Sequence, residues 1–298
     1  MKSPKRDLAG GVALLLAAAP AYAAWDLNLR VGVTPLSRDI YGLHMLILWV
    51  CVAIAVAVFA VMIYSVATFR HSKGATPANF DHSTLAEVIW TIVPVLILVF
   101  MAIPAARTLV AIEDSSGSEL TVKVTGYQWK WQYEYVEHGV SFFSTLARRH
   151  DAARQLDSGV NPRTIDNYLL EVDNPLVVPQ GVKIRVLVTA ADVIHAWWVP
   201  DFGMKKDAIP GFINELWFTA DKAGTYRGQC AELCGRDHGF MPVVVEVKPR
   251  AEFDTWLAAQ KQALQASGDQ PSRVAVSVPP PAAAGAPVTQ PASTEHGT

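Results

Sequence analysis

Two long uncharged stretches constrain the possible folds of this chain more than any other feature of its sequence. Residues 40–69 and residues 88–106 contain no Asp, Glu, Lys or Arg. A helix needs about 20 mostly apolar residues to cross the hydrocarbon core of a bilayer, and each stretch is close to that length or longer. We therefore expect a transmembrane hairpin within residues 24–110, with spans at about 42–68 and 88–106. Two buried core helices are the alternative, which such uniformly apolar stretches disfavour.

The loop between the two stretches predicts their orientation. It carries Arg70 and Lys73, with His71 beside them. Basic residues gather in cytoplasmic loops, so we expect this loop in the cytoplasm. The mature N-terminus and everything after Arg107 then lie outside, in the periplasm of a bacterium. The chain is accordingly predicted to be a two-span protein of the bacterial inner (plasma) membrane, with lipid as one of its partners.

The first residues are typical of a secretory signal peptide. A basic start precedes a short apolar run at residues 8–19, and Ala21-Tyr22-Ala23 fits the small-x-small rule for cleavage. The alternative is a first transmembrane helix, but the apolar run is too short to span a bilayer. We therefore assign residues 1–23 to a signal peptide that is removed from the mature protein.

The chain changes character after residue 110. Overall it is 51% apolar and 17% charged, with the apolar excess confined to earlier residues, so the remainder is typical of a soluble domain. Apolar and polar residues alternate along 127–135, which predicts one strand with an aromatic face. Further short apolar runs, separated by turn residues, predict a β-sandwich or β-barrel over residues 117–266. These runs are 168–172, 182–190, 215–220 and 243–247.

Three segments depart from the strand pattern. Residues 139–167 are polar, rich in Arg and Asp, and are interpreted as an insertion with a short helix. Residues 250–266 follow Pro249 with a helical apolar pattern, and residues 267–298 form a Pro/Ala-rich tail that is expected to be disordered. The net charge of −2 offers no basic excess, so no nucleic-acid partner is expected.

The most informative segment for chemistry is residues 228–241. It contains Cys230, Cys234, His238 and Met241, and His195 adds a second imidazole upstream. Thiolates, imidazoles and a thioether form a soft donor set, which favours copper over hard cations. A blue-copper site needs one cysteine, and the second thiolate allows two coppers bridged by sulfur, an arrangement suited to electron transfer. A disulfide between the two cysteines and a zinc site remain the alternatives.

Several segments together resemble cytochrome c oxidase subunit II, over residues of about 30 to 250. They are Glu87–Pro94, Thr125–Tyr135, Glu171–Asn174, Asp192–Trp198 and Gln229–Met241, in the order that the family has them. The resemblance implies an α+β membrane protein, in which a two-helix transmembrane hairpin is followed by a cupredoxin-like β-barrel. The insertion and the tail depart from the shortest family members, which puts loop geometry in doubt but not the metal site.

The resemblance also implies a ligand set. The dinuclear copper ligands would be His195, Cys230, Cys234, His238, Met241 and the backbone carbonyl of Glu232. The side chain of Glu232 would bind a magnesium or manganese ion shared with subunit I, and an oxygen ligand suits such a hard cation. The alternative for Glu232 is a solvated loop carboxylate.

Further roles are implied outside the metal ligands. Trp129 would be the electron-entry residue, Glu134 and Asp173 would help dock cytochrome c, and Glu87 would take up protons toward subunit I. Each has a simpler alternative: a core aromatic for Trp129, solvated surface charges for the two docking acids, and an acid favoured at a helix N-terminus for Glu87. Lys130 departs from the aromatic residue that many relatives carry, so the docking surface can differ locally.

The implied function is an electron relay. Electrons from cytochrome c would pass to the haem groups of subunit I, where oxygen is reduced to water with proton translocation; subunit III is a further expected partner. A quinol oxidase subunit II would lack the copper ligands, and a nitrous oxide reductase would lack the two spans. A membrane-anchored copper-storage or delivery protein is the alternative from another class. The chain contains no Cys-x-x-Cys-His, so no fused c-type haem is expected.

Overall fold

The computed structural model describes residues 28–76, 79 and 81–267. The predicted signal peptide at 1–23 lies outside the described residues, and so does the predicted tail beyond Ser267. Domain boundaries at these two ends therefore stay predictions.

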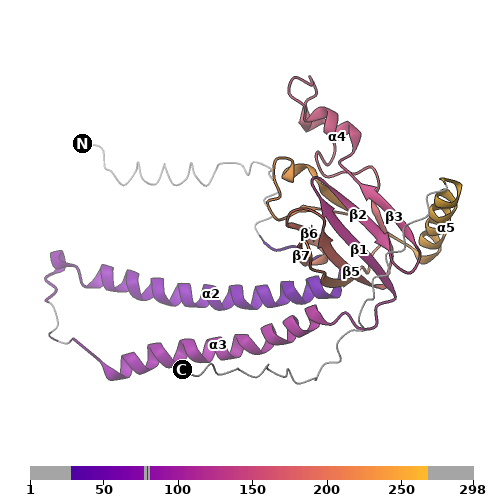
Figure 1. The fold of residues 1–298 in the computed structure, drawn as a ribbon. Helices are drawn as coiled ribbons and strands as arrows, with labels where there is room; N and C mark the ends of the chain where they lie inside the picture. The colour runs from indigo at the N-terminus through magenta and orange to yellow at the C-terminus, as the bar shows by residue number, and fades with distance from the viewer. Residues whose placement is uncertain (1–27, 77–78, 80, 268–298) are drawn as a thin grey trace, which may run out of the picture. The chain divides into compact units, whose positions relative to one another are not determined.

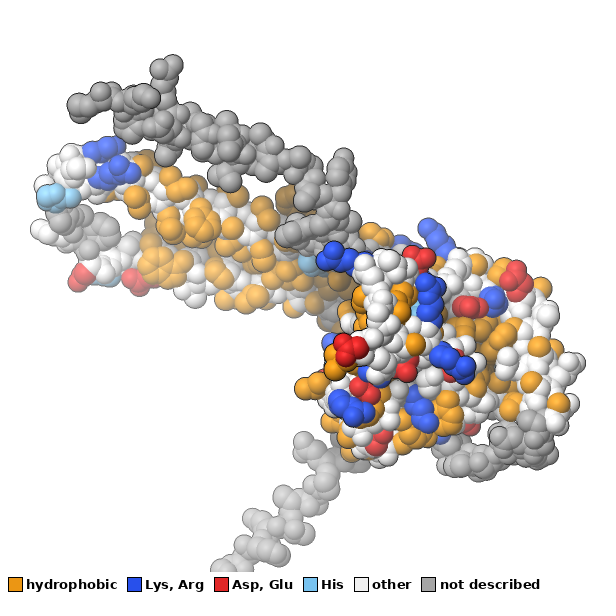
Figure 2. Space-filling model, turned by 90° about the horizontal axis from the view of Figure 1, so that it is seen from above, with side chains coloured by type: hydrophobic (Ala, Val, Ile, Leu, Met, Phe, Trp, Pro, Cys, Tyr) orange, Lys and Arg blue, Asp and Glu red, His pale blue; other side chains and the backbone are white. Residues whose placement is uncertain are grey.

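Two long helices follow the N-terminal segment. Helix α2 spans Pro35–Thr68 and helix α3 spans Thr84–Glu113, with the short 3-10 helix η1, His71–Lys73, between them (Figure 1). Both are long and apolar enough to cross a membrane, and their most apolar windows are not buried inside the protein. Figure 2 shows hydrophobic side chains covering the described surface of these helices, with charged side chains at their far tip and over the β-domain. The predicted pair of spans is present, in helices that extend beyond both predicted ranges.

The start of α2 is fixed by a capping box. The Thr34 hydroxyl accepts a hydrogen bond from the Ser37 amide at 2.9 Å, and the Ser37 hydroxyl accepts one from the Thr34 amide at 3.1 Å. Pro35 occupies the first helical position, where its missing N–H costs nothing. The Thr34 hydroxyl also donates to the Phe202 carbonyl at 2.9 Å, so the cap is tied to the β-domain.

The β-domain is built from two five-stranded sheets. One has the order β3-β2-β1-β5-β8 and the other β4-β10-β9-β6-β7; the pairs β1/β5 and β4/β10 are parallel and the rest antiparallel. This is the predicted sandwich-like domain after the helical hairpin. The strands span Leu120–Tyr127 (β1), Lys130–Tyr135 (β2), Val140–Ser144 (β3), Leu176–Pro179 (β4), Lys183–Ala190 (β5), His195–Val199 (β6), Met204–Ala208 (β7), Asn214–Thr219 (β8), Gly224–Cys230 (β9) and Pro242–Lys248 (β10).

The aromatic strand is shorter than predicted. In β2, Trp131, Tyr133 and Tyr135 are each 0% exposed and form the centre of the core. Residues 128 and 129 instead form the turn between β1 and β2, so the single strand predicted over 127–135 is wrong. The reason is tertiary: the Asp192 carboxylate accepts a hydrogen bond from the Gln128 amide at 2.7 Å and holds the turn.

Two further segments differ from the sequence expectation. The apolar run at 168–172 forms no strand, because Asn167 and Leu169 have φ values of 49° and 65°, in the left-handed region that interrupts an extended chain. The segment 139–167 contains the expected short helix, α4 at Arg148–Ala153, and a 3-10 turn, η2 at Pro162–Thr164. It opens, however, with strand β3, which pairs with β2 and belongs to the sheet.

The last described element is helix α5, Arg250–Ser267, one residue longer than the predicted helix. It packs against β3, which lies beside it in Figure 1, and against β4. Its own Phe253 and Leu257 are buried and belong to the hydrophobic core of the domain.

Candidate metal centre

His195 is held by strand β6. It is 0% exposed, and its Nε2 lies 2.9 Å from the Asp192 carboxylate. Because an ionised carboxylate only accepts hydrogen bonds, Nε2 donates its proton to Asp192, and the other ring nitrogen, Nδ1, faces the cysteine sulfurs. Gly126 on β1 makes room for the ring, since a Cβ there would lie 2.7 Å from the imidazole Cδ2. The strand, the carboxylate and the glycine together fix the orientation of this imidazole.

The remaining predicted ligands lie in the segment from Cys230 to Met241, called the copper loop below. Cys230 ends β9 and Met241 immediately precedes β10. Strand β9 approaches β6 closely at Gly228, where a Cβ would lie only 1.8 Å from the Trp198 carbonyl oxygen. This approach brings Cys230 opposite Trp197 in the sheet, two residues from His195. The short 3-10 helix η4, His238–Phe240, returns the loop toward the cysteines.

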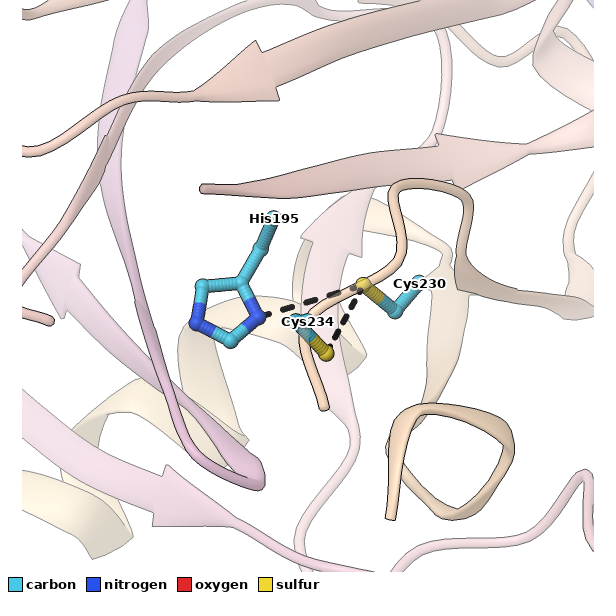
Figure 3. Close-up of side chains that lie close together, drawn as sticks. All are labelled: His195, Cys230 and Cys234. Atoms are coloured by element: carbon cyan, nitrogen blue, oxygen red, sulfur yellow. Dashed lines mark hydrogen bonds between the residues drawn. The ribbon is translucent and has the colours of Figure 1, made fainter. Parts of the chain in front are cut away.

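The donor atoms converge around the two cysteine sulfurs. Figure 3 shows the His195 ring and both cysteine side chains pointing toward one another. The two Sγ atoms lie 3.9 Å apart, Cys230 Sγ lies 3.9 Å from His195 Nδ1, and Cys234 Sγ lies 3.6 Å from His238 Nδ1. Two further donors complete the set: the Glu232 carbonyl oxygen is 3.3 Å from Cys230 Sγ, and Met241 Sδ is 3.5 Å from Cys234 Sγ.

Both cysteines are buried and free, and their pKa values move in opposite directions. Burial raises the pKa of Cys230, but hydrogen bonds from His195 and from nearby backbone groups outweigh it and lower the pKa to about 7. Burial and the neighbouring Cys230 sulfur raise the pKa of Cys234 to about 12. The opposite shifts have a physical cause in common: two sulfurs 3.9 Å apart would repel each other if both were negative, so the second thiol gives up its proton less readily than the first.

The copper loop is held from outside by three side chains of the β1–β2 region. Gln128 Nε2 and Trp129 Nε1 both donate to the Cys234 carbonyl oxygen, at 2.9 and 3.2 Å. Trp131 Nε1 donates to the Met241 carbonyl oxygen at 3.3 Å. Trp129 is half-buried in its turn, whereas Trp131 is fully buried in β2, so Trp129 is not the core aromatic that strict alternation would make it.

The other predicted site residues have ordinary structural partners. The Glu232 side chain is exposed, and Glu134 pairs with Lys123 at 3.5 Å. Asp173 accepts hydrogen bonds from the Thr145 amide and hydroxyl at 2.7 and 2.9 Å. Glu87 lies in the first turn of α3, where its carboxylate accepts from the Ser83 amide at 3.3 Å. Their predicted roles in metal binding, docking and proton uptake stay predictions.

Two residues of the site escaped sequence reasoning. Asp192 lies three residues before His195, and this spacing is the signal that could have revealed a carboxylate orienting the imidazole. Burial raises the pKa of Asp192, but hydrogen bonds from His195 and from the Gln128 and Val193 amides outweigh it and hold the pKa below its usual value. Gly126 had no such signal, because its contact with His195 depends on the packing of β1 against β6.

The donor set fits a pair of soft metal ions. Two thiol groups at its centre, flanked by two imidazoles and a thioether, are the chemistry that copper prefers. A zinc site would leave the thioether of Met241 unexplained. A disulfide is not formed here, since the sulfurs are 3.9 Å apart. The burial of Cys230, Cys234 and Met241, at 3%, 3% and 1% exposure, keeps water away from the sulfur donors.

Comparisons with known proteins point to one family. Residues 120–248 match the family model for the periplasmic domain of cytochrome c oxidase subunit II, and residues 22–107 match the model for its transmembrane domain. A probable cytochrome c oxidase subunit 2 of Rickettsia bellii is 37% identical over 82% of this chain and 87% of its own length. The cytochrome c oxidase subunit 2 of Arabidopsis thaliana is 36% identical over 79% of this chain and 90% of its own length.

Among solved structures, the periplasmic domain of subunit II of a Bradyrhizobium japonicum cytochrome oxidase is 44% identical. The match covers 50% of this chain and 98% of that one, with a TM-score of 0.44. The two family models together span both the hairpin and the β-domain, and the sequence relatives extend along most of the chain. A two-span hairpin joined to a domain with converging cysteine, histidine and methionine donors belongs, in this chain, to the cytochrome c oxidase subunit II family.

Proposed function

We propose that this chain relays electrons into a haem–copper oxidase and holds a dinuclear copper centre in the site described above. The ligands would be His195, Cys230, Cys234, His238, Met241 and the Glu232 carbonyl. The observation that carries the proposal is the 3.9 Å separation of two free cysteine sulfurs, each with an imidazole nitrogen within the same distance. When bound, such a copper pair supplies reversible one-electron chemistry.

The protein's contribution is to hold the donors in place before an electron arrives. His195 is fixed by Asp192, and the Cys234 and Met241 carbonyls are fixed by tryptophan N–H groups. Donors that are already positioned move little when charge changes, which favours rapid electron transfer. Their burial also leaves little room for an oxygen substrate beside the sulfurs, so the site suits a relay, with oxygen reduced in subunit I.

Electron entry at Trp129 is part of the proposal. Its indole is half-buried, so one part is open to a partner while Nε1 donates to the carbonyl of the ligand Cys234 at 3.2 Å. A flat aromatic side chain joined to a ligand by one hydrogen bond is a short route from a surface to a metal site. Glu134 and Asp173 would steer a basic cytochrome c by long-range attraction, which salt screens.

The test separates the docking of cytochrome c from electron transfer in the bound complex. In the assembled oxidase, Trp129→Gln should leave the apparent affinity for reduced cytochrome c similar. Because the aromatic part of the route is lost, electron transfer should slow by at least about tenfold at every salt concentration, which corresponds to about 1.4 kcal/mol of added barrier. Trp217→Gln is the matched control: Trp217 is also half-buried and also donates to a backbone carbonyl, that of Ala111, at 3.1 Å. Glu134→Gln and Asp173→Asn should instead lower the association rate, mainly at low salt.

Flash-photolysis or stopped-flow kinetics across a salt series would measure both quantities. Transfer at the wild-type rate in the bound Trp129→Gln complex would reduce Trp129 to a packing residue of the turn. Two cations add positive charge near this surface. Arg236 lies 5.6 Å from the centre of the Trp129 ring, and Lys130, next to Trp129 in the chain, lies 4.1 Å from the centre of the Phe143 ring. The salt dependence should therefore be weaker than acids alone would produce.

We further propose the membrane arrangement and the remaining partners. The loop with Arg70 and Lys73 would be cytoplasmic, placing both chain ends in the periplasm of a bacterium with the hairpin in inner-membrane lipid. Subunit I would share a magnesium or manganese ion bound by the exposed Glu232 carboxylate, and subunit III would complete the complex. Support for these assignments comes from the basic loop, the exposure of Glu232 and the family membership.

Glu87 is the proposed proton-uptake group at the cytoplasmic end of α3. Its carboxylate is exposed beside the Ser83 amide, where it can exchange protons with water. Glu87→Ala should slow turnover of the assembled oxidase while electron transfer from cytochrome c stays intact. Glu113→Ala, at the opposite end of the same helix, is the control and should turn over normally. Equal turnover of both variants across the pH range would remove Glu87 from the proton path.

A further inference from the structure

Arg154 links the inserted segment to the copper loop. It directly follows helix α4, and its side chain is 22% exposed. The guanidinium carbon lies 4.2 Å from the centre of the Phe240 ring, a cation–π contact. Arg154 Nε donates to Asp151 at 2.8 Å, and Nη1 lies 3.5 Å from the Asp237 carboxylate. One side chain thus contacts two residues of the copper loop while a third residue, on its own helix, fixes its orientation.

Each of the two contacted residues is the neighbour of a proposed ligand in the chain. Asp237 directly precedes His238, and Phe240 directly precedes Met241. Inside this part of the loop, backbone bonds run from the His238 amide to the Gly235 carbonyl and from the Phe240 amide to the Asp237 carbonyl, at 3.2 and 2.9 Å. Those bonds shape a short turn but do not tie it to the sandwich. Arg154, which lies in the insertion, contacts the turn from outside through Asp237 and Phe240.

A hollow lies next to this contact, so Phe240 has room to move if Arg154 is lost. The hollow has a volume of about 280 Å³ and is lined by Trp129, Thr145, Leu146, Asp151, Arg154, Asp237 and Phe240. An aromatic side chain beside such a hollow can shift into it when its neighbour is shortened, because no close-packed wall opposes the movement. A shift of Phe240 would carry the backbone of the ligands on either side.

We propose that Arg154 is a positioning residue, which holds His238 and Met241 in place through Asp237 and Phe240. The proposal rests on the proposed function for the identity of the ligands. Arginine suits the role better than lysine, because its planar guanidinium can stack on a ring and donate to two carboxylates at once. The insertion thereby becomes part of the metal site's scaffold.

The experiment compares Arg154→Gln with Arg149→Gln in the full-length chain. Arg149 is exposed on the same helix, so its substitution makes the same charge change without the loop contacts. The first readout is the alkylation rate of Cys230 and Cys234 in the reduced, metal-free protein, with Cys51 as internal reference. Arg154→Gln should raise the rate at Cys234 several-fold and leave Cys51 unchanged, whereas Arg149→Gln should match the wild type.

The second readout uses the assembled, copper-loaded oxidase. Arg154→Gln should release copper to a chelator roughly tenfold faster, the lower end of what loss of a group supporting a metal ligand causes, and should shift the electron paramagnetic resonance hyperfine pattern. Arg154→Lys should lie between the wild type and Arg154→Gln. A residue that only stabilised the fold would alter yield without altering that pattern.

Identical alkylation rates and hyperfine patterns in Arg154→Gln and Arg149→Gln would overturn the proposal. Because alkylation is measured without metal, it tests the contact of Arg154 with the copper loop even if the wild-type copper count contradicts the proposed function. If Arg154→Gln does not accumulate, Phe240→Leu removes the stacked ring from the other side of the contact. That variant should show the same faster alkylation of Cys234, and a wild-type rate would equally overturn the proposal.

Discussion

The proposed metal ligands come from two kinds of structure, a strand and a loop. His195 belongs to β6, which pairs with β7 and β9, so the sheet itself places its backbone. His238, between Cys234 and Met241, lies in a segment that makes only short-range backbone bonds. Strand placement follows from local pairing, whereas loop placement depends on contacts from distant parts of the chain. The ligands of the loop should therefore respond to substitutions far away in sequence, and His195 mainly to its immediate surroundings.

The largest effect is expected from the carboxylate that orients the strand-held ligand. Asp192→Asn keeps the size of the side chain but removes the charge that fixes the Nε2 proton of His195. We expect copper affinity to fall by about 10- to 100-fold, the usual consequence of losing such a partner. Asp207→Asn is the control, since Asp207 is exposed on the neighbouring strand β7.

Competition with a copper chelator would measure both affinities. An Asp192→Asn affinity equal to that of Asp207→Asn would show that the sheet alone orients His195. The comparison of strand and loop would then sharpen further, because the strand-held ligand would need no partner at all.

A smaller effect should distinguish two glycines near the ligands. Gly126→Ala would place a Cβ 2.7 Å from the His195 ring, whereas a Cβ at Gly239, beside His238 in the loop, would meet nothing within 4 Å. Because the His195 ring is buried and cannot yield freely, Gly126→Ala should cost about 1–3 kcal/mol in the free energy of unfolding. Gly239→Ala should cost much less. Chemical denaturation of the metal-free protein would measure both, and equal costs would contradict the rigid packing assigned to the strand side.

Much of the site could be predicted because its chemistry is contiguous. Cys230, Cys234, His238 and Met241 lie within one segment, and their soft donor types indicate copper before any fold is known. A lone histidine between apolar runs carries no signal by itself, so His195 gains weight as a ligand only from the cluster downstream. The two apolar helices were predictable for a related reason, because a membrane requires an unbroken apolar stretch.

The contacts that hold the site were not predictable. The turn at Gln128 and Trp129 interrupts a perfect alternation, and only the folded positions of Asp192 and Cys234 explain it. The missing strand at 168–172 depends on left-handed backbone at Asn167 and Leu169; asparagine adopts this conformation more readily than most residues, but leucine gives no signal of it. Arg154 lies in a segment whose sequence predicts only a polar insertion with a short helix. For the turn and for Arg154, the deciding interactions join residues far apart in the chain.

The central claim is that one chain holds two coppers that share an unpaired electron. The most direct measurement is elemental analysis combined with electron paramagnetic resonance of the oxidised, detergent-purified full-length chain. The account predicts two coppers per chain and one unpaired electron spread over both nuclei, with the dinuclear signal lost in Cys230→Ser, which removes one of the two cysteine sulfurs that would hold the pair. One copper per chain, zinc in place of copper, or a signal confined to a single nucleus would contradict it.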